Sequence, residues 1–188
     1  LLYIGIARNN EGFRELNEFL TRHNISGDPL PPCPPSFPNA YVIYPAGGIN
    51  GSFSAPRDVL RDNEYLGIRP SSAGRLISMK KSDIARCVIL HTVTMESPAD
   101  YPVHRSLRAV DNNILLSRLT PEMTGSPDEY IIPEADASGP FSMWPQVTDN
   151  TRRLLNDCSL EIDFTTPKNK KIYSASRYDD KLLLEKLA

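Results

Sequence analysis

The chain has 188 residues, of which 40% are apolar and 23% are charged, and its formal net charge is −2. This length suits one domain with a full hydrophobic core, and the composition excludes a disordered chain. No apolar run approaches the roughly 20 residues that cross a bilayer, and the lack of a basic excess argues against a broad nucleic-acid surface. We therefore expect a folded domain with neither nucleic acid nor membrane among its partners.

The start of the chain and its cysteines bear on where the protein works. The sequence begins with Leu1-Leu2-Tyr3-Ile4 and no Met, so we expect a domain, 1–188, that is excised from a longer chain. Its three cysteines are too widely spaced for a disulfide framework or a metal pair: Cys33, Cys87 and Cys158. Reduced thiols fit a cytosolic working place, including one reached by delivery, and leave the compartment itself open.

Regular elements and one proline-rich segment occupy the first quarter of the chain. A short apolar run predicts a strand over 1–7, and apolar residues at helical spacing predict a helix over 10–23. The segment 25–39 carries six prolines, so it forms neither a helix nor a central strand. We expect a stiff surface loop that acts as a spacer, and the alternative is that residues 27–39 dock an assembly partner.

A strand over 41–44 leads into the glycine-rich turn AGGINGS, and Ser54 can cap a helix that begins at Ala55-Pro56 and ends before Gly67. Backbone N–H groups in such a turn can hold a phosphate. The turn matches neither of the two common nucleotide fingerprints, so we interpret it as a tight turn with a serine cap.

The second half of the chain continues this mixture. The run over 87–95 is the strongest strand signal, and apolar residues at helical spacing predict a helix over 102–118. The remaining expected elements are short strands over 75–79, 130–132 and 160–164, a loop over 135–145, and helices over 148–155 and 174–187. About six strands and five helices with long loops favour an α+β fold with mixed sheets in a single compact domain.

The histidines and cysteines give no motif for a metal or a nucleophile. His23, His91 and His104 are far apart, and no metal-binding spacing occurs, so we expect no metal. We interpret His91 as a hydrogen-bonded sheet residue and His104 as a solvated residue at a helix start. The chain has no G-x-S-x-G motif, so nucleophilic hydrolysis has no support.

Glu129 stands in the stretch SPDEYIIP, at the edge of a loop and directly before a β-forming triplet. This stretch resembles the catalytic-glutamate strand of the ADP-ribosyltransferase superfamily. That family has two earlier markers, which Tyr3 through Arg8 and Ser52-Phe53-Ser54 match in the same order. Phe53 stands where the family has Thr, and Pro127 removes the second acidic residue of the arginine-specific members.

The resemblance implies a transfer of ADP-ribose from NAD, as substrate, to a protein target that stays open. Cleavage of the nicotinamide–ribose bond builds positive charge on the ribose, which the carboxylate of Glu129 would stabilise. The resemblance gives NAD-binding or orienting roles to five further residues: Arg8, Ser52, Phe53, Ser54 and Tyr65. We therefore expect Arg8, Ser54 and Glu129 to converge on one cleft.

The alternative is a non-catalytic structural or assembly domain from a larger protein, such as a viral capsid or a multi-subunit complex. The proline-rich loop and the absence of a Met at the start favour this alternative, whereas the ordered set of Arg8, Ser52, Ser54 and Glu129 favours the transferase.

Overall fold

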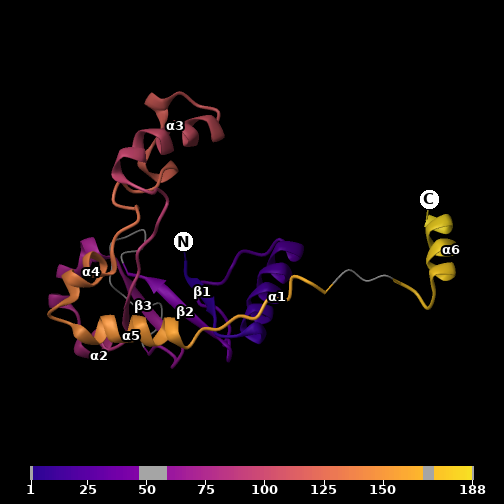
Figure 1. The fold of residues 1–188 in the computed structure, drawn as a ribbon, viewed down its shortest axis with the longest axis horizontal. Helices are drawn as coiled ribbons and strands as arrows, with labels where there is room; N and C mark the ends of the chain where they lie inside the picture. Colours follow the sequence, from indigo (N-terminus) through magenta and orange to yellow (C-terminus); the bar gives the residue numbers. More distant parts are fainter. Residues whose placement is uncertain (1, 47–58, 167–171, 188) are drawn as a thin grey trace.

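The computed structural model describes residues 2–46, 59–166 and 172–187 (Figure 1). Within these residues the protein mixes helix and strand, with six α-helices, five short 3₁₀-helices and one sheet of four strands. The expected mixture of helices and strands is confirmed. The expected number of about six strands is wrong, since the described residues contain four.

The strands of the sheet follow one another in space in the order of the sequence. They are β1 (Ile4–Ala7), β2 (Ala40–Pro45), β3 (Glu64–Ile68) and β4 (Cys87–Ile89). Strands β2, β3 and β4 are parallel, so their carboxyl ends share one edge of the sheet, whereas β1 is antiparallel to β2. The carboxyl end of β1 therefore lies at the opposite edge, where Ala7 pairs with Ala40.

Helix α1 (Asn10–Ser26) covers one face of the sheet and is capped at both ends. The side chain of Asn9 is the N-cap and accepts a hydrogen bond from Gly12 N at 3.0 Å. The helix runs beyond the expected end to Gly27, whose positive φ of 73° suits glycine. A Cβ on Gly12 would lie only 1.8 Å from Asn39 O, so this glycine lets the helix start touch the loop before β2.

The core lies mainly between the sheet and its helices. Its largest cluster joins α1, the central strands and the segments around Leu76 and Phe141, both of which are fully buried. Helix α5 (Pro145–Asn156) packs along β4 and buries Val147 and Leu154. The side chain of Asn150 donates to Ala85 O and Cys87 O at 2.9 and 3.0 Å. Helix α5 therefore also supplies hydrogen-bond donors to backbone carbonyls at the outer edge of β4.

Residues 27–39 contain no helix or strand, as their prolines predict. This loop is nevertheless anchored to the body, since Pro34 and Phe37 are buried and the ring of Phe37 meets that of Phe19 edge-on at 5.5 Å. The carbonyl of Phe37 accepts a hydrogen bond from Asn63 Nδ2 at 2.9 Å. The loop is therefore a packed connection between α1 and β2 rather than a fully exposed spacer.

Three expected elements of the middle of the chain are wrong. The expected helix from Ala55 begins outside the described residues, and its second half is strand β3, because Glu64–Ile68 pairs with parallel strands on both sides. The expected strand over 75–79 falls largely within the 3₁₀-helix Pro70–Ser78. The expected long strand over 87–95 ends at Ile89, and Met95 makes only an isolated bridge with Tyr130.

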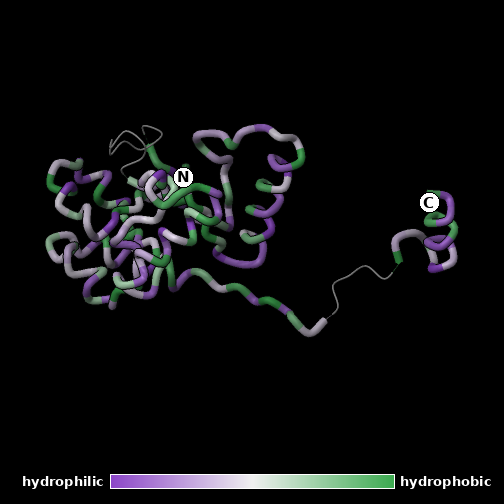
Figure 2. The backbone as a smooth tube through the Cα atoms, turned by 90° about the horizontal axis from the view of Figure 1, so that it is seen from above, coloured by the Kyte–Doolittle hydropathy of each residue, from purple (hydrophilic) through white to green (hydrophobic). Residues whose placement is uncertain are grey.

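The three expected helices of the second half are present with different bounds, as α3 (Tyr101–Asp111), α5 and α6 (Arg177–Leu187). Two short helices were not expected: α2 (Lys81–Ile84) and α4 (Glu134–Ser138), of which α4 lies in the expected loop. Helix α3 projects from the body that contains the sheet (Figure 1). Helix α6, at the C-terminus, lies apart from this body in both views (Figures 1 and 2). Residues 160–164 form an extended segment without strand pairing among the described residues. None of the helices described is both long and apolar enough to traverse a bilayer.

Candidate functional site

A pocket of about 320 Å³ lies where the chain leaves the carboxyl ends of β3 and β4. Arg69 and Ser71 come from the segment after β3, and His91 comes from the segment after β4. Asp128 and Glu129 come from the loop that bridges back to Met95. Ligands of parallel sheets bind at the carboxyl ends of the strands, so this edge is the expected place for a site.

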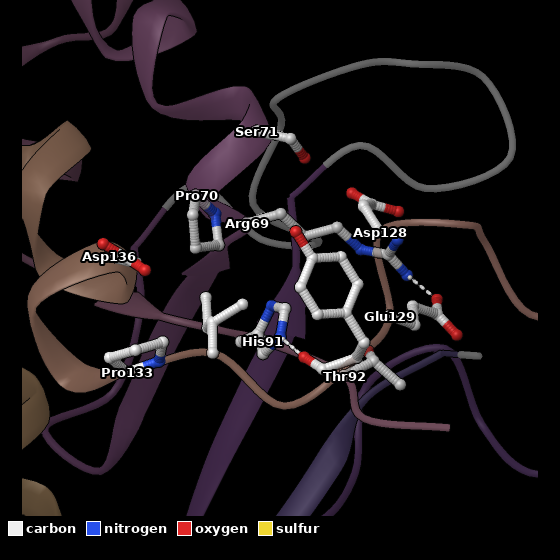
Figure 3. A pocket seen from close by; sticks show the side chains of 11 residues that line it. Arg69, Pro70, Ser71, His91, Thr92, Asp128, Glu129, Pro133 and Asp136 are labelled. Carbon is white, nitrogen blue, oxygen red and sulfur yellow. Dashed lines mark hydrogen bonds and ion pairs between the residues drawn. The ribbon is translucent and has the colours of Figure 1, made fainter. Parts of the chain in front are cut away.

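The centre of the pocket is an ion pair between residues that are distant in the sequence. Arg69 Nη2 lies 2.9 Å from Glu129 Oε1, and Glu129 is only 8% exposed (Figure 3). Such a shielded carboxylate is stable in its ionised form only with a charged partner. The guanidinium of Arg69, which is 41% exposed, supplies that partner and stays open to a ligand on its other side.

The backbone around Glu129 fixes the position of its carboxylate. Thr94 N and Met95 N both donate to Glu129 O, at 2.9 and 3.1 Å, and Glu129 N donates to Ser126 O at 3.1 Å. A Cβ on Gly125 would lie 2.9 Å from Glu129 Oε2, so a glycine there leaves room for the carboxylate. Oε2 accepts no hydrogen bond from the part of the chain that is described, which leaves it available to a bound molecule.

Asp128 adds a second carboxylate beside Arg69 (Figure 3). Hydrogen bonds from the side chains of Ser126 and Ser71, in that order of weight, lower the pKa of Asp128, and the charge of Arg69 lowers it further. Its Oδ1 atom is buried and has no partner among the residues described. Asp128 is therefore an ionised group with unused acceptor capacity.

His91 lies in the pocket wall with one ring nitrogen fixed. A carbonyl oxygen can only accept, so His91 Nε2 donates to Tyr130 O, at 2.7 Å. The other ring nitrogen, Nδ1, forms no hydrogen bond with a described residue. A histidine held in this way can accept a proton through its second nitrogen. The interpretation of His91 as a mid-strand residue is therefore wrong, because β4 ends two residues earlier.

Arg8 does not lie near Glu129. It follows β1, at the edge of the sheet opposite to the pocket, because β1 is antiparallel to its neighbour. There Arg8 Nε donates to Asp157 Oδ2 at 2.7 Å, and its guanidinium lies over the ring of Tyr41 at 5.2 Å. The expectation that Arg8 and Glu129 share a cleft is wrong, and these contacts show Arg8 tying β1 to the end of α5.

Tyr65 also lies away from the pocket. It is buried in the middle of β3, and its ring contacts Arg86 at 5.0 Å and Tyr41 at 5.8 Å. Its burial leaves no face on which a ligand ring could stack. Ser52, Phe53 and Ser54 lie outside the described residues, so their expected roles stay predictions.

The structure brings together residues that sequence reasoning missed. Arg69, Ser71, His91 and Asp136 all line the pocket with Glu129, yet they are separated by up to 67 positions and match no short motif. The signal that the sequence offered for these residues is that they follow apolar runs of the kind that form strands. His104 was also misinterpreted as solvated, since its Nε2 accepts a hydrogen bond from Gly125 N at 2.9 Å.

Two further observations concern cofactors and relatives. Within the described ranges, no group of three or more His, Cys, Asp or Glu side chains is arranged to hold a metal ion. No protein-family model and no curated protein matches the chain, so its function is inferred from the geometry of the pocket.

Proposed function

We propose that the chain is an ADP-ribosyltransferase-like domain that cleaves NAD at the pocket around Glu129 and transfers ADP-ribose to a protein. The observation that carries the proposal is Glu129 itself, a nearly buried carboxylate held by Arg69 at 2.9 Å in a concave site. A fixed negative charge in a site shielded from water stabilises a developing cation more strongly than one in bulk water.

The pocket contains groups for each part of this reaction. As the bond between ribose and nicotinamide breaks, its electron pair leaves with the nicotinamide nitrogen, and Glu129 faces the positive charge that builds on the ribose. Arg69, rather than Arg8, is then the candidate for contact with a phosphate of NAD, because it is the cation that lines this pocket. Nδ1 of His91 can accept the proton of the group that attacks the ribose.

The size of the pocket limits what it can enclose. A volume of about 320 Å³ is at the lower end of the range for ligand sites. It suits the nicotinamide–ribose half of NAD, whereas the adenosine half would lie outside it. Binding of nicotinamide mononucleotide is therefore expected to be comparable with that of NAD.

The test is labelling of proteins in a cell lysate with NAD that carries a label on its adenine. Glu129→Gln keeps the size of the side chain and removes its charge, so we expect it to lower the rate of transfer at least about 100-fold. Glu134→Gln is the matched control, since Glu134 is an exposed carboxylate in a surface ion pair with Arg152. Absence of both NAD cleavage and labelling with the unmodified chain would overturn the proposal.

A second candidate is an assembly domain, and a separate observation favours it. Helix α3 exposes an apolar stripe at helical spacing on the side opposite to its buried Ala109: Val103, Leu107 and Val110. Helix α6 and the extended segment before it also expose large apolar side chains: Ile162, Phe164, Leu184 and Leu187. Apolar surface that gathers on projecting elements is typical of protein–protein contacts.

The second candidate is tested by the size of the protein in solution. Light scattering during gel filtration is expected to give a mass above that of the single chain of 21.0 kDa, increasing with concentration. A single chain at all concentrations, without a bound partner when it is purified from its source, would contradict an assembly role. This outcome leaves the transferase proposal untouched.

A further inference from the structure

The outer edge of β1 pairs with no other strand among the residues that the structure describes. In the described sheet β1 pairs only with β2, and the opposite edge strand, β4, is covered by α5. Arg8 N donates toward β2, to Asn39 O at 2.9 Å, so the pleat turns the backbone groups of Gly5 and Ala7 outward. No backbone hydrogen bond joins either residue to a described residue outside the sheet. Unpaired edge groups of this kind accept an added strand.

An apolar groove of about 500 Å³ runs beside this free edge. Phe13, Leu16 and Leu20 of α1 form one wall, and Cys158 and Leu160 form the other. Phe13 and Leu20 are about half exposed, although both belong to the inner half of an amphipathic helix. The groove therefore combines free backbone groups on its floor with apolar side chains on its walls, as sites for strand addition do.

The chain itself carries a segment suited to this groove. Residues 160–164 alternate apolar and polar side chains, which is the pattern of a half-buried strand. They are extended and pair with no strand in the described part of the single chain, and Phe164 is 88% exposed. We name residues 162–164 the apolar arm, because they lie beyond the last hydrogen bonds that hold this segment to β1 and α1.

The same hydrogen bonds direct the apolar arm away from its own groove. Ser159 N donates to Arg8 O at 2.9 Å, and Asn10 exchanges two hydrogen bonds with the backbone of Glu161, at 2.9 and 3.0 Å. The segment thus passes the end of β1 and continues along the start of α1. To reach Gly5 of its own chain it would have to break these bonds and reverse direction.

We propose that the apolar arm of one copy adds as a strand to β1 of a second copy, and that the exchange is reciprocal in a two-fold dimer. The spacing fits, because Gly5 and Ala7 are two residues apart, as are Ile162 and Phe164, so the backbones can form two pairing positions. Ile162 and Phe164 then lie on one face of the added strand, against Phe13 and Leu20. Reciprocal exchange closes the assembly at two chains.

This inference rests on the second candidate function and is independent of Glu129. Its first test is the dimer dissociation constant of the full chain, measured by analytical ultracentrifugation. Phe164→Asp is expected to weaken the dimer at least about tenfold, since it places a charge in the groove. Ile77→Asp, on the exposed side of the 3₁₀-helix Pro70–Ser78, is the matched control and is expected to leave the constant unchanged. Phe164 is exposed in the single chain, so its substitution does not affect folding.

A disulfide trap tests the contact directly. In the added strand Asp163 lies on the face opposite to Ile162 and Phe164, toward the wall that contains Cys158. Asp163→Cys, under mild oxidation, is expected to cross-link to the native Cys158 in the wall of the partner's groove and to give a covalent dimer. Within one extended chain the two positions are roughly 17 Å apart, too far for a disulfide. The link is expected to disappear when Cys158→Ser is added.

Three outcomes would overturn the inference: a single chain at every concentration, a dimer that Phe164→Asp leaves unchanged, or no cross-link to Cys158. A dimer that only Leu184→Asp dissociates would overturn the strand exchange and still support assembly through α6. The inference and the second candidate function can therefore fail separately.

Discussion

Arg69 and Glu129 are 60 residues apart in the sequence and form an ion pair of 2.9 Å at one end of the sheet. Arg69 follows β3, and Glu129 belongs to the loop that meets Met95 in an isolated bridge. The pair therefore joins the parallel strands to the chain that returns from the α3 projection. It also places a nearly buried carboxylate beside a guanidinium in the pocket at this edge.

Removal of the arginine tests how much this pair contributes to stability. We expect Arg69→Ala to lower the free energy of unfolding by about 1–3 kcal/mol, because it leaves Glu129 shielded from water without a partner. The estimate is below that for a fully buried pair, since Arg69 is 41% exposed. Urea denaturation at pH 7 measures the change. Arg152→Ala removes a wholly exposed pair and is expected to cost less than about 0.5 kcal/mol; equal effects of the two substitutions would contradict the role of Arg69.

Asn150 satisfies the free edge of β4 through two hydrogen bonds to backbone carbonyls, those of Ala85 and Cys87. Asn150→Ala removes both donors from a buried position, so we expect a loss of about 2 kcal/mol in the free energy of unfolding. Asn156→Ala, on the exposed side of the same helix, is the control and is expected to change stability by less than about 0.5 kcal/mol. Hydrogen exchange of the β4 amides in Asn150→Ala is expected to be faster than in the control, and unchanged exchange would contradict the edge-capping role.

Asp157 gives the protein a pH dependence at the other end of the sheet. Hydrogen bonds from Tyr41 and then from Arg8 lower the pKa of this carboxyl. Its contribution to stability is therefore complete above the unfolded pKa, about 3.9, and is lost as the pH falls through the lower folded value. We expect Asp157→Asn to be less stable than the unmodified chain at pH 7, and the difference to shrink below about pH 4.

The hydroxyl of Tyr41, which donates to Asp157, titrates at high pH. Burial, and then the hydrogen bond to Asp157, raise the pKa of Tyr41 to about 12. The folded value is above the unfolded one, so this contribution is present below about pH 10 and is lost as the pH rises through about 12. Melting temperatures of the unmodified chain, Asp157→Asn and Tyr41→Phe from pH 2 to pH 11 test both limbs. A constant difference between the unmodified chain and Asp157→Asn at low pH would contradict the assignment.

The sequence predicted α1 because that helix follows a local rule, apolar residues at helical spacing. It did not predict β3, because Glu64–Ile68 contains a glycine and a charged residue and is fixed as strand by its neighbours on both sides. Glu64 is buried there, where the hydroxyl of Tyr44 and Arg61 N donate to its carboxylate. Tertiary contacts of this kind have no local pattern in the chain.

The candidate site was predictable only in part, because only some of its residues belong to a local sequence pattern. Glu129 was proposed as a site residue from the residues next to it, and it lies in a pocket. Its partner Arg69 comes from another strand end, and only the order of the strands brings the two together. Arg8 carries the positive charge that a phosphate contact needs. It lies at the opposite edge of the sheet, however, because β1 is antiparallel to β2. A single sequence does not specify the direction of β1.

The three cysteines are expected to differ in reactivity. Cys87 is fully buried, and burial, with a smaller effect of Asp83, raises the pKa of its thiol to about 12. Cys33 and Cys158 are partly exposed. A thiol reagent at pH 8 is therefore expected to modify two cysteines in the native protein and the third only after unfolding, because the thiolate is the reactive form. Peptide mass mapping identifies the site, and rapid native modification of Cys87 would contradict its burial.

Gly12 and Gly74 offer a matched pair of glycine substitutions in helical segments. An alanine Cβ at Gly12 would lie 1.8 Å from Asn39 O, a backbone atom that cannot move without shifting the start of β2. An alanine Cβ at Gly74, in the 3₁₀-helix Pro70–Ser78, meets nothing within 4 Å.

Both substitutions reduce the freedom of the unfolded chain in the same way, which alone stabilises by about 0.4–1 kcal/mol. We therefore expect Gly74→Ala to be neutral or slightly stabilising and Gly12→Ala to lower the free energy of unfolding by more than about 2 kcal/mol. Denaturation by urea measures both, and an equal effect of the two would show that the start of α1 does not touch the loop before β2.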